Sequence, residues 1–132
     1  MLNEPTQLSI GRMSTKYSCI IVEDDVDFAE VLQQYLVRVG GLDILAVHGD
    51  TTKAALDIEK HKPDLIFLDI NISGLEGPEF MELVEHRPQI IICSGHPPSV
   101  MSNYDLEIAE YLQKPFTKDQ LEVAVKRSVA ML

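Results

Sequence analysis

Short apolar runs alternate with amphipathic stretches along most of this chain. Five of the runs have the length of strands and cover residues 18–22, 42–47, 65–69, 90–93 and 109–112, and the run that ends at Asp69 reads as a buried strand of a parallel sheet. After the first run, apolar residues recur at helical spacing and stop at two glycines; they are Ala29, Leu32, Leu36 and Val39. This alternation of strand and helix patterns predicts βαβ units.

Four further stretches have helix signals. Asp50 or Thr51 can cap a helix that runs to about His61, and Pro78 suits the first position of a helix that runs to about Glu85. A less regular helix is expected after Pro97-Pro98. Thr117 and Gln120 form a capping box for the last helix. Right-handed crossovers between the strands then give a parallel sheet that helices cover on both faces. The predicted fold is α/β: a flavodoxin-like three-layer sandwich with five strands in the order 2-1-3-4-5 and five helices.

The length and composition indicate one globular domain. We expect residues 1–16, which show no sustained period, to be a mobile leader, and residues 17–132 to form the domain. The net charge of −10 argues against a broad nucleic-acid surface or binding to anionic membranes. The apolar stretches are far shorter than the roughly 20 residues that span a bilayer, so we expect a cytoplasmic protein. Cys19 and Cys93 lie in strand runs and are expected to be buried, reduced thiols.

Polar side chains follow the predicted strands where each one ends. Glu23 and Asp24 follow the first strand, Asp69 closes the third, Ser94 follows the fourth and Lys114 follows the fifth. In the 2-1-3-4-5 order the first and third strands flank the switch point, where open α/β sheets bind ligands. Clustered carboxylates repel each other, and a magnesium ion, which prefers oxygen ligands, would resolve that repulsion.

This combination suits phosphoryl transfer. Asp69 can act as a nucleophile toward phosphorus, Lys114 can neutralise the charge of the transferred group, and the Ser94 hydroxyl can donate to a phosphoryl oxygen. Taken alone, an aspartate at a strand end is more often a helix cap or a turn former. One of the acids at 23–25 is expected to serve as a helix N-terminal acid, and Asp25 is the best candidate.

Four segments resemble the receiver domain of a bacterial two-component response regulator, over about residues 17–131. They read IIVEDD, LIFLDINISGLEG, IICSG and YLQKPF, in that order. The resemblance implies that Asp69 is the phosphoacceptor and that Mg²⁺ is held by Glu23, Asp24, Asp69 and the backbone carbonyl of Asn71. It implies that Ser94 and Tyr111 are the switch residues and that Lys114 is the conserved lysine. It also implies that the peptide bond before Pro115 is cis. The segments are also similar to receivers of the LytTR-type regulator group.

Two positions depart from the family pattern. Ser73 stands where the family commonly has proline, and Glu76 stands where aspartate or asparagine is more usual. Both follow Asp69, so they bear on the stiffness of that loop and on the turnover rate rather than on the chemistry.

The expected function is therefore that of a phosphorylation switch. A histidine kinase or histidine phosphotransfer protein would phosphorylate Asp69, and the surface of the fourth helix, fifth strand and fifth helix would then signal to an effector or output domain, with a homodimer as one option. The domain would catalyse only its own phosphorylation and dephosphorylation. One alternative is a receiver-like interaction module that works without phosphorylation. The other is a phosphohydrolase, but such enzymes usually have a second aspartate where this chain has Asn71.

Overall fold

The computed structural model describes residues 16–70, 81 and 84–132. Its elements are β2 (Tyr17–Val22), α1 (Val26–Val39), β3 (Leu42–His48), α2 (Thr51–His61), β4 (Leu65–Leu68), β5 (Gln89–Ser94), the 3-10 helix η1 (Pro98–Asn103), β6 (Glu110–Gln113) and α4 (Lys118–Ala130). The sheet is parallel throughout, with the strand order β3-β2-β4-β5-β6. In chain order this is 2-1-3-4-5, so the predicted flavodoxin-like topology is confirmed.

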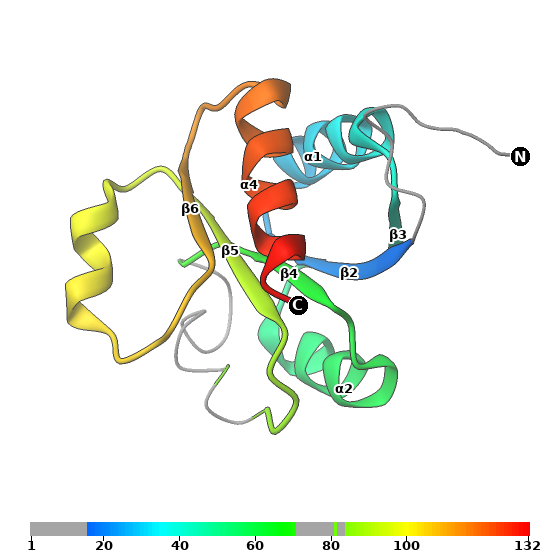
Figure 1. Cartoon of the computed structure of the whole chain (residues 1–132). Coiled ribbons are helices and arrows are strands. Elements are labelled where there is room, and N and C mark those ends of the chain that lie inside the picture. Colours follow the sequence, from blue (N-terminus) through cyan, green and yellow to red (C-terminus); the bar gives the residue numbers. More distant parts are fainter. Residues whose placement is uncertain (1–15, 71–80, 82–83) are drawn as a thin grey trace, which may run out of the picture.

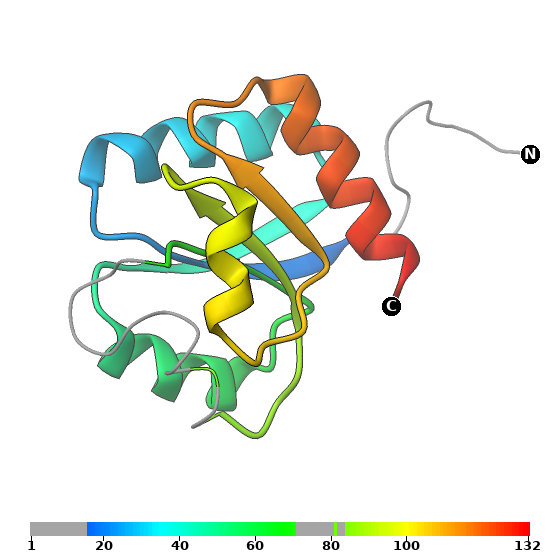
Figure 2. The ribbon, with the colours of Figure 1, turned by 90° about the vertical axis from the view of Figure 1, so that its left-hand side faces the viewer.

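Helices cover both faces of the sheet. α1 and α4 lie on one face and α2 lies on the other, which makes three layers (Figures 1 and 2). One core lies between the sheet and the α1–α4 layer. Its buried residues come from β2, β4, β5, α1 and α4: Cys19, Ile21, Leu32, Leu36, Val39, Leu65, Phe67, Ile91, Cys93, Leu121 and Val125. The three central strands also contribute to a core on the other face of the sheet, which explains their uninterrupted apolar sequences.

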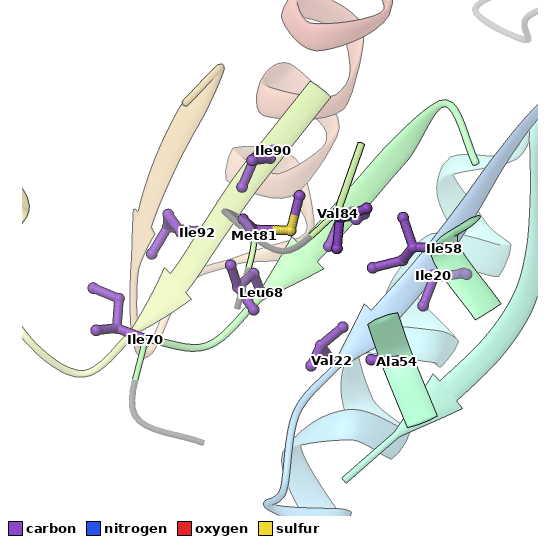
Figure 3. Packing of buried hydrophobic residues seen from close by; sticks show 11 residues of the cluster. Ile20, Val22, Ala54, Ile58, Leu68, Ile70, Met81, Val84, Ile90 and Ile92 are labelled. Atoms are coloured by element: carbon purple, nitrogen blue, oxygen red, sulfur yellow. The ribbon is translucent and has the colours of Figure 1, made fainter. Parts of the chain in front are cut away.

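A second core fills the space between the sheet and α2. Figure 3 shows Ile20 and Val22 of β2 facing Ala54 and Ile58 of α2, with Ile90 and Ile92 of β5 farther along the same face. Both cysteines are buried and free, as predicted. Burial, with a smaller effect from the charge of Asp43, raises the pKa of the Cys19 thiol to about 12.

The helix ends follow the sequence signals. Asp25 caps α1 by accepting a hydrogen bond from the Phe28 N–H at 3.1 Å, which confirms its predicted role. Gly40 ends the same helix with a φ of 78°, a conformation that glycine adopts without a steric penalty. Asp50 caps α2, and Thr117 and Gln120 form the predicted capping box of α4. The four predicted apolar residues of α1 are all buried.

Of the five expected helices, the described residues contain three α-helices, α1, α2 and α4, and one 3-10 helix, η1. The segment after Pro97-Pro98 is a 3-10 helix, closed by bonds such as Val100 N–H to the Pro97 carbonyl at 3.1 Å. Serines and an asparagine supply half of its six residues, and they favour local turns over a helix interior. The helix expected from Pro78 to Glu85 lies largely outside the described residues, as does the leader predicted at residues 1–16. Among the described residues, no helix has the length and apolar character to cross a membrane.

Candidate functional site

Backbone hydrogen bonds align the carboxyl ends of the strands at one edge of the sheet. The Glu23 N–H donates to the His48 carbonyl at 2.9 Å, and the Asp69 N–H donates to the Val22 carbonyl at 3.1 Å. The Lys114 N–H donates to the Ser94 carbonyl at 2.7 Å. The residues that follow the strands are therefore held in register by the sheet itself, which brings together side chains that lie far apart in the sequence.

Three carboxylates form a cluster at this edge. Glu23, Asp24 and Asp69 each present a carboxylate oxygen, and these oxygens all lie within 4.8 Å of one another. Glu23 is buried, Asp69 is partly buried and Asp24 is exposed. Hard oxygen donors at this spacing, with one side open to solvent, fit a magnesium ion that keeps some of its water ligands. Asn71, predicted to lend a backbone carbonyl, lies outside the described residues.

Lys114 joins this cluster as its cation. Its ammonium nitrogen lies 2.7 Å from Glu23 Oε1 and 3.5 Å from Asp69 Oδ2. The Glu23 side chain is 2% exposed, so the ion pair to Lys114 is its main compensation for lost hydration, together with the Asp25 N–H that donates to Oε2 at 3.0 Å. This ion pair between Glu23 and Lys114 is a contact that the sequence pattern does not predict.

Burial and charge shift the pKa values of this pair. Burial raises the pKa of Glu23 above its usual value, and the hydrogen bonds from Lys114 and Asp25 offset this only in part, while the negative charge of Asp69 adds to it. For Lys114, burial acts to lower the pKa, but the hydrogen bond to Glu23 and the charges of Asp69 and Glu23 outweigh it, so the net shift is upward. Lys114 is therefore a cation at neutral pH.

An aromatic ring completes the surroundings of Lys114. The ammonium nitrogen lies 4.0 Å from the ring centroid of Phe28, on the first turn of α1. Phe28 in turn meets Phe116 edge to face, with the centroids 5.6 Å apart and an interplanar angle of 79°. Phe28 is not predicted as a site residue by the sequence pattern, whose one signal for it is an aromatic residue four positions after Asp24.

Ser94 and Tyr111 are linked through one loop residue, His96. Ser94 is fully buried, and its Oγ accepts a hydrogen bond from the His96 N–H at 3.1 Å. The Tyr111 hydroxyl donates to the His96 carbonyl at 2.7 Å. Next to Ser94, a Cβ placed on Gly95 would meet no atom within 4 Å, so this side of the site is open. The peptide bond between Lys114 and Pro115 is cis, as the resemblance implied.

Comparison with known proteins identifies the family. The sequence model of the response regulator receiver domain matches residues 19–126, which is most of the chain. The chain belongs to the response regulator receiver domain family. Accepting a phosphoryl group in two-component signalling is the general function of this family.

Individual relatives agree with this assignment. The receiver is 28% identical over 112 residues to an uncharacterized response regulatory protein of Shewanella oneidensis, covering 83% of this chain and 48% of that protein. It is 23% identical over 112 residues to the sensory transduction protein LytT of Bacillus subtilis, covering 82% of this chain and 46% of LytT. The chain therefore spans about half the length of these relatives, and the LytT match agrees with the predicted similarity to LytTR-type regulators.

A solved structure supports the fold. The response regulatory domain of protein mrkE from Klebsiella pneumoniae superimposes with a TM-score of 0.77 at 23% identity, covering 86% of this chain and 96% of that domain. At this identity the likeness concerns the fold alone.

Proposed function

We propose that this receiver accepts a phosphoryl group on Asp69, in a magnesium-dependent reaction, and relays the signal through a change at Ser94 and Tyr111. The observation that carries the proposal is the cluster of Glu23, Asp24 and Asp69 with the Lys114 ammonium 3.5 Å from Asp69 Oδ2. A carboxylate nucleophile, an oxygen-rich cation site and a lysine are the groups that phosphoryl transfer to an aspartate needs.

The burial of the three carboxylates indicates which of them can bind Mg²⁺ directly. Exposed Asp24 and partly buried Asp69 are the better direct ligands for Mg²⁺, while Glu23 has one oxygen on Lys114 and the other on the Asp25 N–H. Asn71 is proposed to complete the set with its backbone carbonyl. A bound Mg²⁺ supplies positive charge that offsets the repulsion between the carboxylates and the incoming phosphoryl group.

Asp69 is the nucleophile of the transfer step. One of its carboxylate oxygens attacks the phosphorus of a phosphohistidine; the new O–P bond forms as the P–N bond breaks, and the electron pair of that bond leaves with the imidazole nitrogen. Lys114 stabilises the negative charge of the phosphoryl oxygens. In the reverse phase, water attacks the phosphorus of the aspartyl phosphate, which yields inorganic phosphate and restores the Asp69 carboxylate.

The switch would work through His96. Ser94 Oγ accepts from the His96 N–H, and the Tyr111 hydroxyl donates to the carbonyl of the same residue. When Ser94 turns to donate its hydroxyl to a phosphoryl oxygen, it gives up the contact with His96, and the anchor of Tyr111 shifts with it. The surface of η1, β6 and α4, which corresponds to the predicted fourth helix, fifth strand and fifth helix, is then remodelled.

The partners follow from the chemistry. We propose a histidine kinase or a histidine phosphotransfer protein as donor, an effector or output domain as receiver of the signal, and the cytoplasm as the place of reaction. The surface of η1, β6 and α4 is also the proposed contact for a homodimer.

Intact-mass spectrometry tests the phosphoacceptor. Incubation with Mg²⁺ and acetyl phosphate should add the mass of one phosphoryl group to the wild type and none to Asp69→Ala. Asp25→Asn is the matched control, because it changes a neighbouring acid that caps α1 and lies outside the cluster, and it should still be phosphorylated. A phosphorylated Asp69→Ala would refute the assignment. A wild type that gains no phosphoryl group and binds no Mg²⁺ at millimolar concentration would instead support the phosphorylation-independent module.

A further inference from the structure

The ring of Phe28 holds the ammonium group of Lys114 in a specific place. The 4.0 Å separation between Nζ and the ring centroid is well inside the range of about 6 Å over which a cation is attracted to an aromatic face. Lys114 is only 20% exposed, so water weakens this attraction less than it would at an open surface. The contact therefore contributes to where the ammonium sits, in addition to its two carboxylate partners.

Phe28 is itself fixed from two sides. Its N–H is the group that the Asp25 carboxylate caps, so the first turn of α1 sets the direction of the ring. Phe116 packs its ring edge-to-face against Phe28 and comes two residues after Lys114. The lysine and the ring that supports Phe28 thus lie on one short segment, residues 114–116, beside the first turn of α1.

A phenyl ring beside Lys114 attracts the ammonium group without neutralising it, as a third carboxylate next to Glu23 and Asp69 would. The ammonium lies closer to Glu23, at 2.7 Å, than to Asp69, at 3.5 Å, so electrostatics alone would draw the flexible lysine stem toward Glu23. The quadrupole of a phenyl face attracts a cation but carries no net charge. It can therefore hold the ammonium within reach of Asp69 while leaving its positive charge available to a phosphoryl group.

From this geometry we infer that Phe28 is a positioning residue for phosphoryl transfer, acting through Lys114 by a cation–π contact. This role rests on the proposed phosphorylation of Asp69. The contact between Phe28 and Lys114 can be measured in the unphosphorylated protein without Mg²⁺ or a phosphodonor, so a missing contact and a missing phosphorylation can be told apart.

The first measurement detects the contact by NMR in the presence of EDTA. The ε-methylene signals of Lys114 should show an upfield ring-current shift in the wild type and in Phe28→Tyr, and should lose it in Phe28→Leu. Val31→Ala is the matched control, because Val31 is 41% exposed and lines the same groove of about 190 Å³ beside Phe28 and Lys114. It should leave the Lys114 shift in place. If Phe28→Leu keeps the wild-type shift, the contact does not exist in solution and the inference is overturned.

The second measurement asks whether the ring acts through its electrons or only through its shape. Phenylalanine with one, two or three ring fluorines, placed at position 28, keeps the shape but progressively weakens the attraction to a cation. The rate of phosphorylation by limiting acetyl phosphate should fall stepwise along this series. With cyclohexylalanine, which fills the same space without a π face, it should be roughly two- to tenfold below the wild type. Circular dichroism and thermal melting check that each protein is folded.

The outcomes separate the possibilities. A flat rate across the fluorinated series, or a full wild-type rate with cyclohexylalanine, would reduce Phe28 to a packing residue and overturn the positioning role. Wild-type rates in Phe28→Tyr and Val31→Ala, with a stepwise loss in the fluorinated series, would support it. A wild type that no donor phosphorylates would refute the proposed function and the positioning role with it, while the NMR shift would still report on the contact between Phe28 and Lys114.

Discussion

Replacing Lys114 with methionine removes the cation from a buried carboxylate. Methionine keeps much of the apolar stem of lysine, so the main change is electrostatic. Glu23, with a side chain that is 2% exposed, then retains only the Asp25 N–H among the partners described above. Removing one member of a buried ion pair typically destabilises a protein by about 3–5 kcal/mol, because the remaining charge stays buried without compensation.

Protonation of Glu23 limits this loss and makes it depend on pH. From an unfolded-state pKa of about 4.3, protonation costs about 1.36 kcal/mol per pH unit, which is about 3.7 kcal/mol at pH 7 and about 1.6 kcal/mol at pH 5.5. In Lys114→Met the folded-state pKa of Glu23 is raised further by the loss of its cation. The stability of the variant relative to the wild type is therefore highest below the unfolded-state pKa and declines as the pH rises from there to the folded-state pKa. Because burial already raises the pKa of Glu23 in the wild type, we expect the penalty to shrink by at most about 2 kcal/mol between pH 7 and pH 5.5.

Urea unfolding at the two pH values, in EDTA to exclude metal, measures the penalty. The double variant Glu23→Gln/Lys114→Met is the control, because a neutral amide at position 23 has no charge to leave unpaired. It should be more stable than Lys114→Met at pH 7, and its free energy of unfolding should lack the loss with rising pH that the unpaired Glu23 causes in Lys114→Met. An equal penalty for Lys114→Met at both pH values, or a double variant as unstable as the single one, would show that an unpaired charge on Glu23 does not cause the loss.

Three further outcomes follow from other contacts. Tyr111→Phe removes the hydroxyl that donates to the His96 carbonyl, and in urea titrations it should lower the free energy of unfolding by about 1 kcal/mol. If the variant is as stable as the wild type, this hydrogen bond does not stabilise the fold. Thr117→Ala removes the cap of α4 and should lower it by about 1 kcal/mol, whereas Thr117→Ser should retain most of the stability. Cys19 and Cys93 are buried with raised pKa values, so a thiol reagent should label them only as fast as the protein unfolds, and rapid native labelling would contradict their burial.

The ends of the helices could be predicted from the sequence because they are set by interactions between residues close together in the chain. Asp25, Gly40 and the Thr117 capping box each act within a few residues, and all three were predicted in place. The segment after Pro97-Pro98 was harder, because its few apolar residues are compatible with either helix type. Its serines and asparagine disfavour an α-helix interior, and with the prolines at its start they favour the 3-10 helix that the structure has.

The site was predictable in its members but not in its contacts. The strand order brings Glu23, Asp69 and Lys114 to one edge, so their proximity follows from topology. The pairing of Lys114 with buried Glu23 and with the face of Phe28 depends on side-chain directions that only the packed structure fixes. The effects predicted for Ser73 and Glu76 lie in a segment outside the described residues and stay predictions.

Locating the phosphoryl group within the chain is the sharpest test of Asp69 as the phosphoacceptor. After reaction with acetyl phosphate and Mg²⁺, borohydride reduction converts an aspartyl phosphate to homoserine, which peptide mass spectrometry can place in the sequence. We predict homoserine at position 69 and at no other aspartate, and no conversion when Mg²⁺ is replaced by EDTA. Homoserine at Asp24, or a retained phosphoryl group on a residue such as His96 without any homoserine, would contradict the account.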